Sequence, residues 1–170
     1  RRGGRAAVLT NSLATNDVIA AHGAYARYRS GLLAAGVELH ELQPNARALH
    51  RQVRLFKGRS QASLHTKAMV LDRREVFVGS FNIDPRSVHL NTEMGYYVAS
   101  AELGQQVAAF IEEGLAPENS FRLSREDGKL AWAADGEEGV PEVLYREPRV
   151  SVVRWLAAWL LARLPIERFL

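Results

Sequence analysis

Residues 63–82 read SLHTKAMVLDRREVFVGSFN, with two strand-like apolar runs on either side of a short charged segment. We predict strands over residues 64–72 and 76–79. His65 and Lys67 are two residues apart, so on a strand their side chains leave the same face. Gly79 permits a tight turn after the second strand, and Ser80 and Asn82 beyond it again share a face.

These polar side chains suit the cleavage of a phosphodiester. The reaction needs a nucleophile or an acid that works near neutral pH, which the imidazole of His65 supplies. It also needs positive charge and hydrogen-bond donors for the non-bridging oxygens, which Lys67, Ser80 and Asn82 supply. The stretch therefore predicts part of a catalytic site, against the alternative of a strand-turn-strand unit with incidental polar residues.

Three further residues are candidates with less defined roles. Glu93 opens the next expected strand, and its carboxylate is either the acceptor for the Nδ1 proton of His65 or a surface acid. Asp72 ends its strand, where a carboxylate commonly fixes a turn by accepting backbone N–H bonds. Arg86 either contacts a phosphate or pairs with an acid.

The rest of the chain predicts an α/β fold, a mixed sheet flanked by helices. A strand over residues 5–10, a helix over 17–35 ended by Gly36, and a strand over 37–42 form a crossover unit with parallel strands. The region 43–62 predicts a loop. Further elements are expected as a strand over 93–99, a helix over 101–116 and short strands around 121–123 and 130–133. Tyr25, Tyr28, Tyr96 and Tyr97 are expected as core or half-buried aromatic residues.

The composition fits one ordinary domain, since 47% of the 170 residues are hydrophobic and 24% are charged. Cysteine is absent, which excludes disulfides and cysteine nucleophiles, and the histidine spacing disfavours a zinc site. The net charge of +3 is a mild bias towards anionic partners. The basic residues gather near the quoted stretch, as either a solvated face or an anion-binding rim; they are Arg47, Arg51, Arg54, Lys57, Arg59, Lys67, Arg73 and Arg74.

The C-terminal segment 150–164 is apolar almost all round and predicts a helix. Its length of roughly 22 Å is too short for a bilayer core of roughly 30 Å. Two interpretations fit: a helix lying in a membrane interface, or a helix buried against its own or a partner domain. We therefore expect a catalytic lobe over residues 1–148 and a separate apolar helix within 149–170.

The motif HxKxxxxD followed by GSxN, from His65 to Asn82, resembles the signature of the phospholipase D superfamily. Glu93 falls where that family carries a downstream acid. The flanking segments, from LTNSLATNDV to LPIERFL, resemble bacterial cardiolipin synthases of the branch typified by cardiolipin synthase C. The chain begins at Arg1, and the resemblance implies that it is the C-terminal half of a longer protein, one lobe of a two-lobed fold.

The resemblance implies a mechanism that uses two such motifs. One histidine attacks phosphorus to give a phosphohistidine, and the other acts as acid and base; His65 would take the second role. No metal or other cofactor is implied. The implied acceptor is phosphatidylglycerol, and the donor is phosphatidylglycerol or phosphatidylethanolamine. The protein would be peripheral on the bacterial cytoplasmic membrane.

Only one HxKxxxxD motif occurs in this sequence. Either an N-terminal half supplies the second motif, or a second copy of the chain does. The first alternative function is therefore a homodimeric phospholipase D-type nuclease or phosphodiesterase, although the apolar C-terminus makes nucleic acid an unlikely partner. The second alternative is an inactive half-domain.

Overall fold

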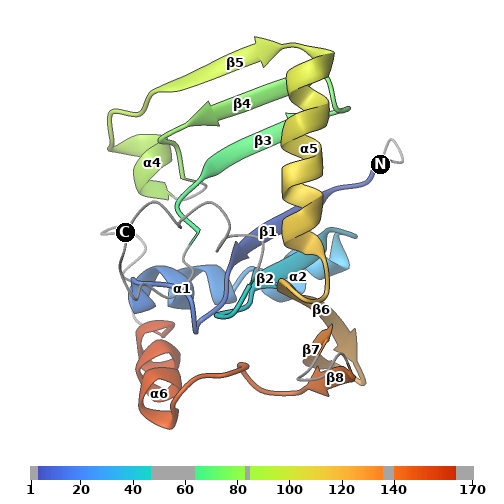
Figure 1. Ribbon diagram of the computed structural model, residues 1–170. Helices are drawn as coiled ribbons and strands as arrows, with labels where there is room; N and C mark the ends of the chain where they lie inside the picture. The colour runs from blue at the N-terminus through green and yellow to red at the C-terminus, as the bar shows by residue number, and fades with distance from the viewer. Residues whose placement is uncertain (1–3, 47–63, 83–84, 136–139, 164–170) are drawn as a thin grey trace, which may run out of the picture. The chain divides into compact units, whose positions relative to one another are not determined.

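The computed structural model describes residues 4–46, 64–82, 85–135 and 140–163 (Figure 1). The chain divides into two compact units. Unit 1 holds the described residues up to Leu64 together with those from Gly114 onward, and unit 2 holds residues 65–113. These units are compact parts of the fold and are not defined by function. The expected boundary at residue 148, between a catalytic lobe and the C-terminal helix, therefore stays a prediction.

Unit 1 is built on a five-stranded mixed sheet with the order β1-β2-β6-β7-β8. β1 and β2 are parallel, as the predicted crossover requires, and every other pair is antiparallel. The predicted α/β class with a mixed sheet is confirmed, although the structure adds β8, which we had not expected. The strands are β1 (Ala7–Asn11), β2 (Glu38–Leu42), β6 (Ser120–Glu126), β7 (Lys129–Asp135) and β8 (Pro141–Leu144).

The crossover between β1 and β2 contains two helices where one was predicted. α1 (Ile19–Ala26) and α2 (Arg29–Ala34) are separated at Arg27 and Tyr28. There the N–H of Tyr28 bonds to the carbonyl of Tyr25, three residues back, and the side chain of Arg29 turns into the interior. Gly36 ends α2 with a φ of 84°, which confirms the predicted left-handed cap.

The core of unit 1 lies against this sheet. Its buried members come from β2, β6 and β7, and they are Leu39, Phe121, Leu123, Trp132 and Ala134. β6 and β7 are longer than predicted because Asp127 and Gly128 join them as a two-residue hairpin, with φ values of 50° and 79°. Left-handed backbone at both positions is the geometry of a type I′ turn, which Asp-Gly favours.

The C-terminal segment forms α6 (Val152–Leu161), which lies against α1 in unit 1 (Figure 1). Ser151 caps the helix, its Oγ accepting from the N–H of Arg154 at 3.3 Å. The two helices approach closely, since a Cβ added at Gly23 would lie 3.1 Å from the nitrogen of Ala162. Within the described part of the chain, no helix is long and apolar enough to cross a bilayer.

Unit 2 is a three-stranded antiparallel sheet with the order β3-β4-β5. Its elements are β3 (Lys67–Leu71), β4 (Glu75–Gly79), α4 (Pro85–His89), β5 (Gly95–Ala99) and α5 (Ala101–Leu115). α5 confirms the predicted helix, and its last two residues belong to unit 1. Gly104 lets it approach the β3–β4 turn, since a Cβ there would lie 2.4 Å from the carbonyl carbon of Arg73.

Several expectations about exposure are wrong. Tyr28, Tyr96 and Tyr97 are 54%, 68% and 62% exposed, because Tyr28 lies at the break between α1 and α2 and the other two lie on the edge strand β5. Most of the basic run and of the predicted loop, residues 47–63, lies outside the described residues. Lys67, Arg73 and Arg74 are the members of the basic run that the structure describes.

Candidate active site

The candidate segments meet at one end of the sheet in unit 2. Lys67 pairs with Gly79, and Gly79 pairs with Gly95, so the start of β3, the end of β4 and the start of β5 are neighbours. Ser80 follows β4 directly, while His65 and Glu93 each lie two residues before a strand. With strands about 4.8 Å apart, these side chains lie around an area roughly 10 Å across, the size of one phosphodiester and its substituents.

His65 and Lys67 lie where the chain enters β3. His65 is exposed and precedes the strand, so the expectation that both residues belong to one strand is wrong. Lys67 is the first strand residue, and its Nζ donates to the backbone carbonyl of His65 at 2.9 Å. The lysine therefore lies beside the histidine through a backbone contact rather than through strand alternation.

Ser80 is bonded to the chain segment that precedes β5. Its Oγ donates to Oε2 of Glu93 at 2.5 Å and accepts from the N–H of Met94 at 3.1 Å. Its own N–H donates to the carbonyl of Met94 at 2.9 Å. These bonds hold the first residue after β4 in one place, next to the paired Lys67 and Gly79.

Ser87 of α4 extends this network, and the sequence analysis missed it. It is 5% exposed, its Oγ donates to Oε1 of Glu93 at 2.8 Å, and it accepts from the backbone N–H of Asn82 at 3.4 Å. Nδ2 of Asn91 also donates to Oε1 of Glu93, at 3.2 Å. One carboxylate thus ties together the segments on either side of the site. The sequence signal for Ser87 was its place in the polar run that links Asn82 to Glu93.

Glu93 supports Ser80 rather than His65 in this structure. Among the described contacts, no hydrogen bond joins Glu93 to His65, so the expected pair is not brought together. The hydrogen bond from Ser80, and then that from Ser87, lower the pKa of the Glu93 carboxyl below its ordinary value. The group is therefore an ionised acceptor at neutral pH.

Gly79 is required for a reason other than the predicted turn. It lies within β4, and a Cβ added there would lie 2.4 Å from the carbonyl oxygen of Met94 and 2.7 Å from the Cα of Gly95. A side chain would push β5 away from β4, because backbone atoms cannot yield as a flexible side chain does. The glycine therefore keeps the Glu93 segment close enough to bond Ser80.

Asp72 is not part of this cluster. It follows the far end of β3, five residues beyond Lys67, which corresponds to roughly 16 Å along a strand. It has a φ of 50° in the turn before β4, a left-handed conformation that aspartate tolerates. Its predicted place in a turn is confirmed, and a direct chemical role beside His65 is not compatible with that distance.

Asn82 and Arg86 complete the set of predicted residues. Asn82 is exposed, and its backbone is tied to Ser87 as described above. Arg86 belongs to α4, but its side chain lies outside the described residues. No group of three or more histidine, aspartate and glutamate side chains that could hold a metal ion occurs in the described part of the chain.

Comparison with known proteins identifies the family of the chain. Residues 1–114 match the family model described as cardiolipin synthase, PLD-like domain. The chain belongs to this family. Over 98% of its length it is 42% identical to cardiolipin synthase C of Escherichia coli strain K12, of which it covers 35%. It is also 34% identical, over 78% of its length, to uncharacterized proteins from two Helicobacter pylori strains, of which it covers 25%.

The match to the cardiolipin synthase, PLD-like domain family includes every predicted site residue, since all lie before residue 114. The chain spans about a third of the length of the Escherichia coli relative. No solved structure matches it. The shared family confirms the resemblance on which the expected fold was based.

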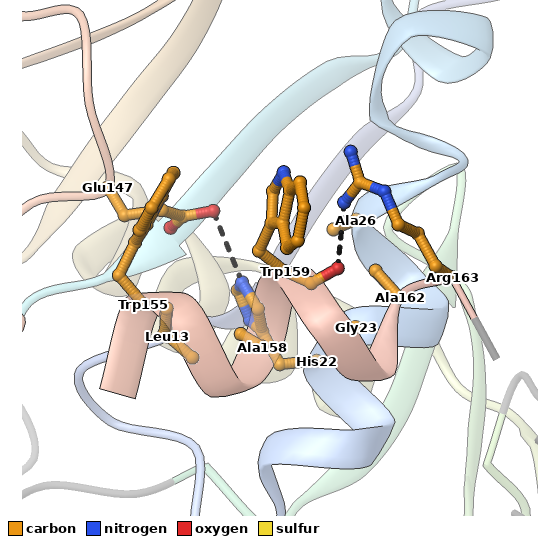
Figure 2. Close-up of a pocket in the computed structure, with 10 residues that line it drawn as sticks. All are labelled: Leu13, His22, Gly23, Ala26, Glu147, Trp155, Ala158, Trp159, Ala162 and Arg163. Carbon is orange, nitrogen blue, oxygen red and sulfur yellow. Dashed lines mark hydrogen bonds and ion pairs between the residues drawn. The ribbon is translucent and has the colours of Figure 1, made fainter. Parts of the chain in front are cut away.

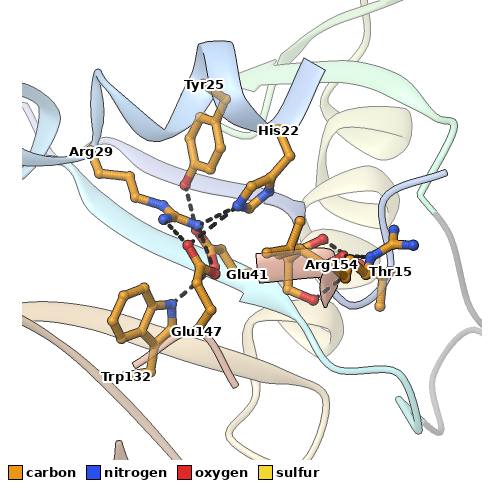
Figure 3. Close-up of polar contacts among 10 residues, drawn as sticks. Thr15, His22, Tyr25, Arg29, Glu41, Trp132, Glu147 and Arg154 are labelled. Atoms are coloured by element: carbon orange, nitrogen blue, oxygen red, sulfur yellow. Dashed lines mark hydrogen bonds and ion pairs between the residues drawn. The ribbon is translucent and has the colours of Figure 1, made fainter. Parts of the chain in front are cut away.

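A second polar cluster lies in unit 1 of the chain, around the buried Arg29 (Figure 3). Nε of Arg29 donates to Oε1 of Glu41 at 2.7 Å, and Nη1 donates to Oε1 of Glu147 at 2.5 Å. Nη2 lies 3.0 Å from Nε2 of His22. Tyr25 and Trp132 each donate to Glu41 at 3.0 Å. Every charged group is therefore paired, as expected of a cluster that stabilises the fold, although Nδ1 of His22 is buried without a hydrogen-bond partner.

Electrostatics in this cluster favour the ionised forms. Burial by itself would raise the pKa of the Glu147 carboxyl. The hydrogen bond to His22 and the charge of the Arg29 guanidinium together outweigh burial and lower this pKa to about 2. For Arg29, burial opposes the charge, and the attraction of Glu41 and Glu147 raises the pKa instead. The cluster joins α2, β2 and the segment before α6 by charge.

Beside this cluster, a cavity of about 160 Å³ lies between α1 and α6 (Figure 2). Its lining is mainly apolar and includes Trp155 and Trp159, with His22 and Glu147 on the side of the Arg29 cluster. Neither His65 nor Lys67 lines it. All of its lining residues belong to unit 1, and none of them is a candidate site residue.

Proposed function

We propose that this chain supplies one half of the active site of a phosphatidyltransferase that transfers a phosphatidyl group between phospholipids. The observation that carries the proposal is the convergence of His65, Lys67 and the Ser80–Asn82 segment at one end of the unit 2 sheet. Imidazole, ammonium, hydroxyl and amide are the groups that a metal-independent displacement at phosphorus requires. The family of the chain supports a phospholipid as the substrate.

In the proposed reaction, a histidine from the missing half attacks phosphorus and forms a P–N bond. The P–O bond to the headgroup alcohol breaks, and His65, acting as the acid, gives that alcohol its proton through Nε2. His65 then takes the proton of the acceptor hydroxyl, whose oxygen attacks phosphorus and releases the first histidine. Donor and acceptor exchange one proton and one phosphatidyl group, so no further reactant is needed.

The other residues act on the phosphate and on the geometry. Lys67 neutralises the charge of the non-bridging oxygens, and Asn82 donates a hydrogen bond to them. Ser80 is a further donor once its hydrogen bond to Glu93 breaks. Glu93 positions Ser80, and Arg86 contacts a phosphate. Asp72 shapes the β3–β4 turn and so acts only through the position of β3.

The proposal requires a partner for the site, because one motif provides one histidine and one lysine. The missing N-terminal half or a second copy of the chain supplies the others. The chain covers about a third of its Escherichia coli relative, which favours the first source. The substrates are phosphatidylglycerol, with phosphatidylglycerol or phosphatidylethanolamine as donor, and the protein works at the surface of the bacterial cytoplasmic membrane.

The test is cardiolipin formation by the full-length protein from phosphatidylglycerol, with and without phosphatidylethanolamine, followed by mass spectrometry. We expect His65→Ala to lower the rate by at least roughly 1000-fold, because removing an acid–base group leaves only binding and electrostatics. Val143→Ser, on the exposed strand β8, is the control and should leave the rate unchanged.

A phospholipid donor with a labelled phosphate tests whether His65 is the acid and base or the nucleophile. If His65 is the acid and base, the His65→Ala protein still traps a phosphatidyl group on the other histidine. Loss of that covalent label would make His65 the nucleophile. Unchanged cardiolipin synthesis by His65→Ala would refute the proposed site altogether.

A further inference from the structure

α6 has two faces that differ in exposure. Ala158 is 6% exposed on one face, whereas Val152, Val153, Leu156 and Leu160 on the other are 79%, 79%, 53% and 56% exposed. At 100° per residue, these four side chains occupy one continuous arc of the helix. We call them the α6 ridge. Trp155 and Trp159 lie along one edge of the ridge and are 41% and 43% exposed.

The buried face fixes the rotation of α6 on unit 1. Gly23 of α1 leaves room for the backbone at Ala158 and Ala162. Nε of Arg154 donates to the carbonyl of Leu13 at 2.8 Å, and its Nη2 donates to the carbonyl of Asn16. The helix therefore cannot roll to hide the ridge, which points away from α1.

The charged residues in α6 and in its flanking residues along the chain are all basic. Between residues 148 and 163, the sequence has Arg149, Arg154 and Arg163 and no acidic residue. The nearest acid is Glu147, whose carboxylate is already paired with the buried Arg29. Arg163 stays exposed at the end of the helix, with its guanidinium 3.4 Å from the centre of the Trp159 ring. Arg154 is bound to backbone carbonyls and Arg149 to Asn45, so Arg163 is the exposed cation beside the ridge. A surface that combines an apolar ridge with an exposed arginine is complementary to an anionic, apolar partner.

We propose that the α6 ridge inserts into the interfacial region of an anionic phospholipid membrane. This inference rests on the proposed function, because a phospholipid substrate makes a lipid surface the expected partner. The ridge side chains would enter the acyl boundary, Trp155 and Trp159 would lie at headgroup level, and Arg163 would contact a lipid phosphate. The cavity between α1 and α6 opens beside the same two tryptophans (Figure 2).

Vesicle binding tests this proposal with matched variants. The full-length protein carrying His65→Ala would be mixed with vesicles of phosphatidylcholine alone or with phosphatidylglycerol, and bound protein separated by flotation. Val152→Ser/Val153→Ser removes part of the ridge. The control, Val140→Ser/Val143→Ser, replaces two valines at β8 that are 62% and 45% exposed. We expect the ridge variant to bind about tenfold more weakly and the β8 variant to bind like the parent.

Tryptophan fluorescence reports the insertion directly. Trp132 is 4% exposed in the core, so within this chain the tryptophans that can respond to vesicles are Trp155 and Trp159. Their signal is the part of the blue shift on adding phosphatidylglycerol vesicles that Trp155→Phe/Trp159→Phe removes. The shift should disappear in Leu156→Ser/Leu160→Ser and decrease with added salt. Circular dichroism of each variant checks that the helix is still folded.

The outcomes separate this inference from the proposed function. Equal vesicle binding by the ridge and β8 variants would overturn the ridge proposal, even if cardiolipin were still made. A change in oligomeric state of the ridge variant, without a change in vesicle binding, would also overturn it and make another protein surface the occupant. Ridge-dependent binding, together with no cardiolipin synthesis by the full-length protein that retains His65, would support the ridge and refute the function.

Discussion

The two polar clusters of this protein differ in burial although they use similar residue types. Around Arg29 in unit 1, Glu41 and His22 are 0% and 1% exposed and every charge has a partner. Around Glu93 in unit 2, Ser80, Asn82 and His65 are exposed. In the first cluster the charged groups bind one another, and Nδ1 of His22 is buried without a hydrogen-bond partner. The second cluster presents donors to solvent.

This difference in burial separates a cluster that stabilises the fold from a cluster available for chemistry. A buried charge that loses its partner costs far more than an exposed one, so the Arg29 cluster is expected to control folding. An exposed cluster contributes little to folding, and its groups remain available to a phosphate. The predictions below ask whether folding and activity can be separated in this way.

The largest expected effect is on stability. Arg29→Met should lower the free energy of unfolding by about 3–5 kcal/mol, because Glu41 and Glu147 would remain buried without a counter-charge. Chemical denaturation measures the change. Arg5→Met is the matched control: Arg5 bonds Glu38 at 2.7 Å, but its side chain is 71% exposed. Its effect should be at most about 1 kcal/mol. Similar losses in the two variants would contradict the comparison.

The next effect is on activity. Lys67→Met in the full-length protein should lower the rate of cardiolipin formation roughly 100- to 1000-fold, because a donor to the developing phosphorane charge is lost. Its free energy of unfolding should change by no more than about 0.5 kcal/mol, as for other surface substitutions. A rate close to that of the parent, or a large loss of stability, would place Lys67 outside the proposed role.

A third expected effect is a pH dependence of stability. The pKa of Glu147 is about 2 in the folded protein, below its ordinary value of 4.5. Its stabilising contribution is therefore complete above pH 4.5 and is lost as the pH falls towards 2. Denaturation across this range should show a steeper loss for the parent than for Glu147→Gln. Parallel curves would mean that the Glu147 pair does not contribute.

Much of unit 2 was predictable because its signals are local. Apolar runs separated by Asp72-Arg73-Arg74 predict a hairpin, and the motif from His65 to Asn82 identifies the family. The role of Gly79 was not predictable, since the strand that approaches it lies more than ten residues later in the chain. The support of Ser80 by Glu93 and Ser87 depends on the same pairing.

Unit 1 shows the converse limits. Periodicity predicted one helix over residues 17–35, but the structure has two helices, α1 and α2, and the second begins at the buried and paired Arg29. The Asp127-Gly128 turn had a local signal that the analysis did not use, so β6 and β7 were predicted too short. α6 was predicted as a helix, yet periodicity could not choose its buried face because it is apolar almost all round.

The sequence by itself determined the mixed α/β class, the family and the candidate residues, because these depend on residue type and spacing along the chain. The tertiary structure decided which of those residues are neighbours. It separated Asp72 from His65 and paired Glu93 with Ser80 by a hydrogen bond. It also buried Arg29 between two carboxylates and left the α6 ridge exposed. Strand register and helix packing bring together residues far apart in the chain, and no local pattern encodes those distances.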